Sequence, residues 1–551
     1  MPRMKNTTDT LRRAAAWLAA AAFLLPALVV MLRAPKVPYA DQWRFQAHLL
    51  STPFPQNVVN ADNGHHELLP SLVRLAELYW LHGGQWLQIG IGIVLLLATL
   101  ALGWRQLAAL PASQRHAAWL ALLLGLCWLG NQRALGHGNE TVHAYSVTAL
   151  LLAGLQVLGQ RLRPGAGAAG IAALCGLAAA FSFGSGIATF AAFFPMLWLT
   201  RARPAAWATL SLGLVLTLAA LQLTGDSAGA LAFAPLSWIS SWLRWLAGPW
   251  IHAAWPALDP ALAERLPPAL GALLAPVASA YEGRFGPVML AWFPHIPIAL
   301  AGLAALAWLL LKAWLAPQTP PAPAQRLGIG IALFAAATGA LVAVVRDAYF
   351  QTYPDQLLAP RYLVWSSLFW AGLLLAATAR ASSPRRALSL VLAVAVVLLP
   401  SQLWTARLTG SMRQVAAHVA AAAAVGVVDR AAPRGENVPA EIATALPLQR
   451  QAQVEMFAWP QARWLGRTPP SQPLAVRDLQ VEAVDNLLET PARRVRFATG
   501  AAGGDARLLL VDADGVARGL AVPDPGAGPD RWIGWMEGGD TTPPQAMRMP
   551  E

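Results

Sequence analysis

Apolar runs alternate with polar segments along the first 404 residues of the chain. Several runs reach about 18 residues, the length that a helix needs to cross the hydrocarbon core of a bilayer. The pattern therefore predicts an all-α polytopic transmembrane bundle of about eleven helices. The runs at 168–182 and 187–199 are short and also fit one hairpin broken at residues 182–186. The predicted helices span residues 14–32, 86–103, 117–130, 144–159, 168–182, 187–199, 206–223, 287–311, 327–345, 363–379 and 387–403.

The pattern changes after residue 404. An alanine-rich helical stretch at 415–428 is followed by short runs in which apolar and polar residues alternate. Turn signals such as Asp514-Gly515 separate the last of these runs, as is typical of strands. We therefore expect two domains: a transmembrane domain at 1–404 and a small C-terminal α+β or β-rich domain at 405–551.

Composition supports the membrane class. The chain has 551 residues, of which 56% are hydrophobic and 12% charged, whereas soluble domains carry about 25% charged residues. The net charge of +12 does not indicate nucleic-acid binding, because its excess lies in the hydrophobic part of the chain. The two cysteines, Cys127 and Cys175, lie inside apolar runs and indicate neither a disulfide framework nor a metal site.

The distribution of basic residues predicts the orientation of the bundle. If the N-terminus lies in the cytoplasm, the cytoplasmic segments contain fifteen Lys or Arg residues and one acid, Asp9. Such a bias is typical of cytoplasmic loops, so the C-terminal domain is predicted to be extracytoplasmic. Arginine greatly outnumbers lysine, as in high-GC bacteria, and the predicted location is a bacterial inner membrane. A signal peptide is the alternative for the first run, but its length and the lack of a small-x-small site before Arg33 favour a retained anchor.

Three predicted external loops are long enough to carry a site: residues 33–85, 224–286 and 346–362. The second loop is rich in tryptophan, which favours a pair of interfacial helices; a further membrane helix in this loop is the alternative. Polar residues gather on this face, and no acid lies at the centre of a predicted helix. This distribution argues against a conduction path or an ion-coupled transporter.

The first loop holds the densest candidate chemistry. Asp41 lies close to the end of the first helix, where a carboxylate can act as general base toward a hydroxyl acceptor or help to hold a divalent cation beside a phosphate. An ordinary juxtamembrane acid is the alternative. His65, His66 and Glu67 follow in the same loop. Adjacent side chains diverge, so the two histidines are poorly placed to share one ion; one histidine paired with Asp41 or with a phosphate is the hypothesis we favour, and a solvated loop is the alternative.

A second group of candidates precedes the predicted helix at 363–379. Arg361 and Tyr362 lie where this helix meets the lipid headgroups, and Asp347 lies upstream of them. A guanidinium at that depth can bind a phosphate through two parallel N–H donors. A snorkelling arginine beside an interfacial tyrosine is the alternative. A third polar cluster, at residues 131–143, lies on the same predicted face.

Together these features resemble the GT-C superfamily of integral-membrane glycosyltransferases, which take a sugar from a polyprenyl-phosphate donor. The similarity rests on order and placement: an early aspartate in the first external loop (Asp41), an amphipathic stretch before the second helix, the Arg361-Tyr362 pair at the start of a late helix, and a terminal external domain. The segment 63–70 also resembles the first loop of uncharacterised bacterial members. The resemblance covers residues 1–404.

The resemblance implies a transferase that acts on an envelope glycan or lipid at the external face. Asp41 would be the catalytic base or an acceptor-orienting carboxylate, and His65 or His66 would assist at the phosphate or at a metal. Arg361 would bind the lipid-linked phosphate. Many members carry two adjacent acids in the first loop, whereas here Gln42 follows Asp41, so the resemblance leaves metal dependence open. Mg²⁺ or Mn²⁺ is the candidate cofactor, without assigned ligands. The other candidates for substrate binding are Trp43, Glu67, Asp347 and Tyr362.

Two other classes of protein fit the same pattern. One is a non-catalytic protein that assists polysaccharide assembly in the envelope, and the other is a transporter of a lipid or a sugar. The expected partners of the transferase are the lipid-linked sugar donor, the glycan or lipid acceptor and the membrane lipid itself.

Overall fold

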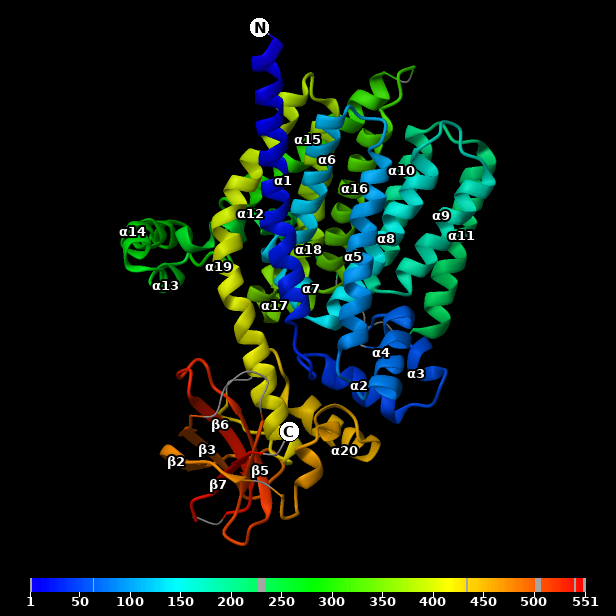
Figure 1. Cartoon of the computed structure of the whole chain (residues 1–551). Helices are drawn as coiled ribbons and strands as arrows, with labels where there is room; N and C mark the ends of the chain where they lie inside the picture. Colours follow the sequence, from blue (N-terminus) through cyan, green and yellow to red (C-terminus); the bar gives the residue numbers. More distant parts are fainter. Residues whose placement is uncertain are drawn as a thin grey trace.

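The computed structural model describes residues 2–62, 64–225, 233–316, 318–432, 435–470, 472–500, 507–539 and 542–548. In these ranges the eleven predicted apolar runs coincide largely with helices, which form an elongated bundle (Figure 1). The helices are α1 (Pro2–Leu32), α5 (Trp86–Gln106), α6 (Ala112–Cys127), α8 (Gly138–Gly159), α9 (Ala166–Ala180), α10 (Thr189–Leu199), α11 (Pro204–Thr224), α15 (His295–Leu315), α16 (Pro323–Val345), α18 (Pro360–Arg380) and α19 (Pro384–Ala424).

Eight helices of the described ranges are long and apolar enough to cross a membrane, namely α1, α5, α8, α11, α15, α16, α18 and α19. Helices α6, α9 and α10 are shorter. A break is present near the predicted residues 182–186: α9 ends at Ala180, a 3-10 turn spans Gly184–Ala188, and α10 follows. The predicted helical membrane bundle is confirmed at this level.

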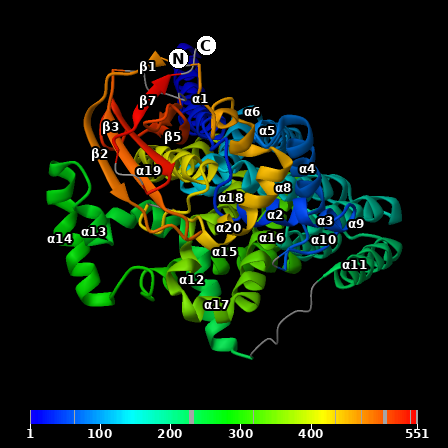
Figure 2. The same ribbon diagram turned by 90° about the horizontal axis from the view of Figure 1, so that it is seen from below.

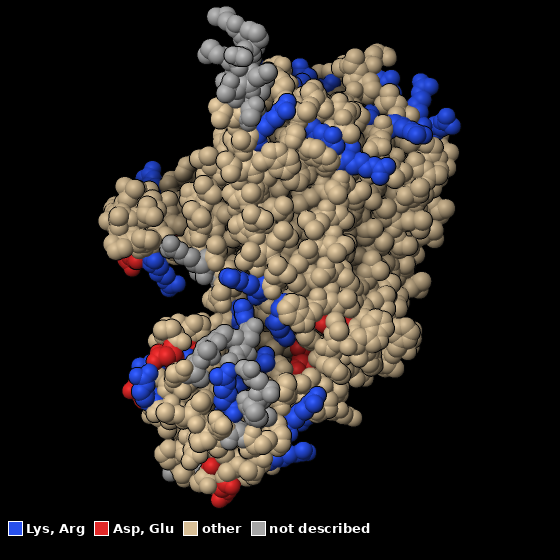
Figure 3. All heavy atoms as spheres, in the orientation of Figure 1, with Lys and Arg blue, Asp and Glu red and all other residues tan. Residues whose placement is uncertain are grey.

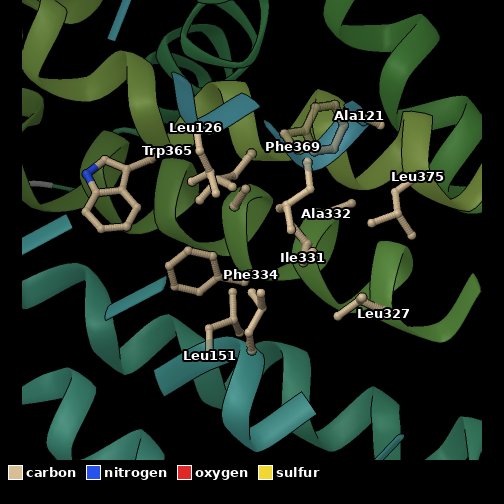
Figure 4. Packing of buried hydrophobic residues seen from close by; sticks show 14 of the residues in the cluster. Ala121, Leu126, Leu151, Leu327, Ile331, Ala332, Phe334, Trp365, Phe369 and Leu375 are labelled. Carbon is tan, nitrogen blue, oxygen red and sulfur yellow. The ribbon is translucent and has the colours of Figure 1, made fainter. Parts of the chain in front are cut away.

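The centre of the bundle is the contact between α16 and α18, which also pack against α8 and α6 respectively. Figure 4 shows Phe334, Trp365 and Phe369 in this core, and all three are buried. The two helices approach closely at a pair of glycines, because a Cβ on Gly328 would lie only 2.5 Å from the carbonyl oxygen of Gly372. Small residues permit such an approach, and close packing is what holds membrane helices together.

The first loop folds into three short helices, α2 (Gln42–Ser51), α3 (Gln56–Val59) and α4 (Leu68–Leu81), at the end of the bundle where α1 ends (Figure 1). At the same end lie α7 (Gln132–Gly136), between α6 and α8, and α17 (Asp347–Thr352), between α16 and α18. The first loop, the 131–143 cluster and the third loop therefore share one end of the bundle, which we call the loop end.

The tryptophan-rich loop forms α12 (Pro235–Ala254), α13 (Pro260–Ala263) and α14 (Pro268–Phe285), while residues 226–232 lie outside the described ranges. Helix α12 is not a surface helix, because its residues 245–249 are buried and it contacts α15, α16 and α18. By contrast, α13 and α14 project sideways from the bundle in both views (Figures 1 and 2). Only the second half of this loop stands apart from the bundle, as an interfacial segment would.

The C-terminal domain begins without a break in the chain. Helix α19 has 41 residues, about 60 Å at 1.5 Å per residue, and it runs from the bundle into the domain (Figure 1). The predicted boundary at 404/405 therefore lies inside one helix. The domain also contains α20 (Pro439–Ala452).

Seven antiparallel strands of the domain form one sheet in the order β1-β7-β4-β5-β6-β3-β2, which curves into a half-barrel. The alanine-rich end of α19 contacts β5 and β6. This architecture confirms a β-rich C-terminal domain. The strands are β1 (Gln472–Pro473), β2 (Arg477–Ala483), β3 (Ala492–Ala498), β4 (Leu508–Val511), β5 (Ala517–Pro523), β6 (Arg531–Glu537) and β7 (Gln545–Arg548).

The two ends of the bundle differ in charge. On the face shown in Figure 3, basic side chains gather at the end where α1 begins, and no acidic side chain is visible there. The middle of the bundle is almost free of charge in this view, and the C-terminal domain carries both signs. Acidic side chains of the first loop and the tail thus lie away from the basic end.

Candidate functional site

The C-terminal domain covers the loop end of the bundle and contacts α2 through α20. The amide oxygen of Asn437 accepts hydrogen bonds from the Ala40 backbone (2.9 Å) and from the Trp43 indole (2.8 Å). Ala40 has a φ of +53°, a conformation that costs energy for a residue with a Cβ, and the bond to Asn437 helps to hold it. Trp43 is wholly buried, so this candidate for substrate binding is a core residue of the contact between loop and domain.

Asp41 lies at the surface of this contact. Its side chain is 40% exposed and lies 3.8 Å from the Arg44 guanidinium. Arg44 also pairs with Asp62 and with Glu441 of α20, each at 3.2 Å, and these two carboxylates are about 20% exposed. Burial alone would lower the pKa of Arg44, but the three carboxylates outweigh it and raise this pKa. Arg44 therefore stays charged, and Asp41 is the carboxylate of this group that a ligand reaches most easily.

A second group of side chains joins the first loop to the corner between α16 and α17. Asp62 and His65 exchange backbone hydrogen bonds of 3.0 Å, and the Nε2 atom of His65 accepts a 3.0 Å hydrogen bond from Arg346. Because an arginine only donates, the imidazole carries its proton on Nδ1. Burial, with a smaller contribution from Arg346, lowers the pKa of His65 to about 4. The Nε2 lone pair of His65 is thus occupied by Arg346, and the contact holds this guanidinium in place; a direct role of His65 in chemistry stays a prediction.

The ring of Phe183 keeps His65 in place. It stacks with the imidazoles of both His65 and His143, at centroid distances of 4.8 and 5.0 Å and an interplanar angle of 22° in both pairs. Phe183 belongs to the break between α9 and α10. The next residue, Gly184, leaves room for the histidine, since a Cβ there would lie 2.7 Å from His65 Nδ1. The break thus contributes an aromatic platform to the site.

Glu67 belongs to a buried network. Its carboxylate pairs with Arg74 of α4 and lies 3.2 Å from the His143 imidazole of α8, and Arg74 also donates to Asn139. Burial would raise the pKa of Glu67, but Arg74 and His143 outweigh burial and lower it. Glu67 therefore holds α4 against α8 as an ionised group, and its buried side chain offers little surface to a substrate.

His66 and Asp347 also contact protein neighbours. His66 is buried and meets the Phe181 ring nearly edge-on, with the ring centres 5.3 Å apart. Asp347 is the first residue of α17 and accepts a 2.6 Å hydrogen bond from Ser237 of α12. These contacts position the first loop and α17, and a direct role of either residue in chemistry stays a prediction.

Arg361 and Tyr362 begin α18 beside the same corner. The Arg361 guanidinium donates to the Tyr349 hydroxyl of α17 at 3.2 Å and lies 5.2 Å from the centre of the Tyr362 ring. Between Arg346 and Arg361 the chain forms α17 and a 3-10 turn, Pro354–Leu358. Within the described ranges no direct contact joins Arg361 to Asp41, so these two predicted residues are connected only through the loop and the corner.

The candidate divalent cation has no preformed cluster of ligands in the described ranges, where no three His, Cys, Asp or Glu side chains converge. The carboxylates that gather on the first loop, those of Asp41, Asp62 and Glu441, surround the guanidinium of Arg44 instead.

Another buried carboxylate reaches the first loop from the C-terminal domain. Glu455 accepts hydrogen bonds from the side-chain amides of Gln46 and, at 3.3 Å, Gln85. Burial, and to a smaller extent the nearby Glu77, raises the pKa of Glu455 well above its ordinary value. The neutral form of this carboxyl is therefore favoured in the folded protein.

Glu455→Gln is expected to stabilise the protein at high pH. The folded wild type holds a proton that the unfolded chain releases above the ordinary pKa of 4.5, so its stability falls as the pH rises from there through the raised pKa. Glutamine keeps the acceptor oxygen and does not ionise. Thermal unfolding in detergent should show a midpoint a few degrees above wild type at pH 8 and an equal midpoint at pH 4.5. The exposed Glu537→Gln serves as control, and an equal gain at both pH values would contradict the prediction.

Neither a protein-family model, nor a curated protein, nor a solved structure matches the chain. The functional argument therefore rests on the side chains at the loop end.

Three side chains that organise this site were not among the predicted site residues: Arg74, Phe183 and Arg346. Arg346 directly follows an apolar run and precedes Asp347. Like Arg361, it lies at the end of a predicted membrane helix, and this position could have identified it as a candidate. In the sequence, Arg74 looks like an ordinary polar residue on an amphipathic helix. Phe183 is an ordinary apolar residue in the sequence, and its role depends on contacts with residues distant in the chain.

Proposed function

We propose that the protein is a membrane glycosyltransferase that transfers a sugar from a polyprenyl-phosphate donor to an acceptor of the cell envelope. The observation that carries the proposal is the hydrogen bond between Arg346 and His65. It holds a guanidinium from the end of an apolar helix against the loop that contains the exposed carboxylate of Asp41. A phosphate-binding cation and a proton acceptor are the two groups that such a transfer requires of the protein.

The proposed reaction uses these groups in one displacement. Arg346 and Arg361 bind the donor phosphate through their planar donor forks. The acceptor hydroxyl oxygen attacks the anomeric carbon while the bond from that carbon to the phosphate oxygen breaks, and the polyprenyl phosphate leaves with the bonding electrons. Asp41 takes the proton of the attacking hydroxyl. His65 acts as a positioning residue for Arg346.

The proposal includes the orientation of the chain. We propose eleven membrane helices, with the N-terminus in the cytoplasm and the loop end on the external face of a bacterial inner membrane. The support is the basic end of the bundle where α1 begins (Figure 3), since Lys and Arg concentrate in cytoplasmic loops. The lipid-linked donor then reaches Arg361 laterally from the outer leaflet.

The test is a transfer assay on membranes that contain the full chain, with a radiolabelled polyprenyl-phosphate sugar and an envelope extract as acceptor. Arg346→Gln is expected to lower transfer about ten- to hundredfold, because one charge-assisted contact to the phosphate is lost. The matched control is Arg477→Gln in the C-terminal domain, where the arginine side chain is 68% exposed, and its transfer should equal that of wild type.

Two results would contradict the proposal. One is equal transfer by Arg346→Gln and wild type. The other is gradient-dependent uptake of the sugar into proteoliposomes without transfer, which would identify a transporter. His65→Ala should lower transfer less than Arg346→Gln does, because it loosens the guanidinium without removing it.

A further inference from the structure

A cavity of about 580 Å³ lies between the end of α1, α7, α19 and the C-terminal domain. Its wall toward the bundle has an apolar part that includes Val29 and Val30 of α1 and Leu129 near α7. Its wall toward the domain includes Val522 and Pro523 of β5. The volume falls within the range of small-molecule sites, about 300 to 1,000 Å³.

Three arginines from distant parts of the chain line this cavity: Arg33 after α1, Arg413 in α19 and Arg507 before β4. The side-chain amides of Gln132 and Gln414 also line the cavity, and the amide of Gln414 donates to the adjacent Asp524 at 2.7 Å. No carboxylate occurs among the described lining residues themselves. Like charges around one cavity repel each other, and guanidinium groups bind phosphate well. Arg507 also lies over the Trp459 ring. Among the described residues at this cavity, three arginines stand beside one adjacent carboxylate, that of Asp524, so the lining favours an anion.

The position of the cavity indicates the kind of anion. Arg33 directly follows the candidate membrane span Arg13–Leu32, so it lies at the depth where the apolar core of a bilayer gives way to headgroups. The neighbouring side chains of Leu25, Val29 and Leu32 are exposed on α1 and offer a surface to acyl chains. A lipid contacts both the apolar wall and the arginines, whereas a soluble phosphate contacts only the arginines.

We infer that this cavity binds an anionic phospholipid of the bilayer, with the phosphate against Arg33, Arg413 and Arg507 and the acyl chains along α1 and α19. Because Arg507 belongs to the C-terminal domain and Arg33 to the bundle, the lipid connects the two domains. The inference is independent of the proposed transferase, since the cavity shares no residue with the site around Asp41 and Arg346.

Native mass spectrometry of the full chain in detergent tests the lipid and its source. Phosphatidylglycerol is expected to bind about tenfold more tightly than phosphatidylcholine, whose choline group neutralises its own phosphate, and this ratio corresponds to about 1.4 kcal/mol. Arg33→Gln combined with Arg413→Gln should abolish the preference. Equal binding of the two lipids, a preference that survives this double substitution, or displacement of phosphatidylglycerol by an equal concentration of inorganic phosphate would overturn the inference.

A second pair of variants tests the cavity without removing charge. Gly410 lines the cavity, and a Cβ at this position meets no atom within 4 Å, so Gly410→Leu projects into open space and occupies it. Gly90 of α5 is equally open but lies elsewhere. Leucine favours a helix over glycine, so both variants should fold. We expect Gly410→Leu to lose the preference for phosphatidylglycerol and Gly90→Leu to keep it; an unchanged preference in Gly410→Leu would rule out this cavity.

Discussion

Asp41→Asn is expected to lower the proposed sugar transfer about 10²- to 10⁴-fold, the contribution of a well-placed general base. The amide keeps the size of the side chain but does not accept the proton of the attacking hydroxyl. The fold should be unaffected, because Asp41 makes no side-chain capping bond to α2. Its ion-pair partner Arg44 remains bound to Asp62 and Glu441, both at a shorter distance than Asp41.

The measurement combines initial rates of transfer with the thermal unfolding midpoint of the same preparation. The midpoint of Asp41→Asn should match that of wild type, so the loss of rate reports on the chemistry. Asp485→Asn, which changes a mostly exposed aspartate of the C-terminal domain, is the matched control and should transfer at the wild-type rate. Full transfer by Asp41→Asn would show that Asp41 is not the general base. The phosphate-binding role of Arg346 is tested separately, by the Arg346→Gln variant.

Arg74→Ala is expected to destabilise the protein by about 3 to 5 kcal/mol, as happens when one partner of a buried ion pair is removed. Arg74 is the counterion of Glu67 and also donates to Asn139. Its guanidinium lies 4.2 Å from the centre of the Phe45 ring, so the variant also loses packing between α4 and α2. The remaining Glu67 carboxylate would be left in a buried place without its main compensating charge.

A double variant separates the charge from the packing. Glu67→Gln added to Arg74→Ala removes the uncompensated carboxylate, so the double variant should recover part of the lost stability, as measured by denaturant or thermal unfolding in detergent. The exposed pair of Arg430 and Asp485 provides the comparison, because Arg430→Ala should change stability by at most about 1 kcal/mol. Additive losses in the Glu67 and Arg74 variants would show that the two groups do not stabilise each other.

The helical segments were predictable because run length and hydropathy are local properties of the chain. The ends of these helices were less predictable. The predicted run at 287–311 contains a single ionisable residue, His295, yet α15 begins only there, directly after Pro294. A helix that began at residue 287 would place Pro294 in its interior, where proline is disfavoured. Helix α12 was assigned to the interface because of its tryptophans. Its burial against α15, α16 and α18 depends on surfaces that the sequence of α12 does not contain.

The strands of the C-terminal sheet were also predicted only in part. The alternating runs predicted at 474–484, 495–497, 506–511 and 517–522 coincide with strands β2 to β5, although residues 501–506, next to β4, lie outside the described ranges. Strand β6 was not predicted. Its residues between Trp532 and Met536 are buried on both faces, so the strand lacks the alternation of apolar and polar residues that identifies a half-exposed strand.

What the sequence by itself determined is the helical membrane class, the approximate position of each apolar helix, the β-rich tail and the segments that carry unusual polar residues. These follow from local hydropathy and from charge along the chain. Only the tertiary structure decided which polar residues meet: His65 with Arg346, Glu67 with Arg74 and His143, and the first loop with Asn437 and Glu441 of the tail. The physical reason is that a buried polar group needs a hydrogen-bond partner, and packing supplies one that lies up to 409 positions away in the chain, as between Gln46 and Glu455.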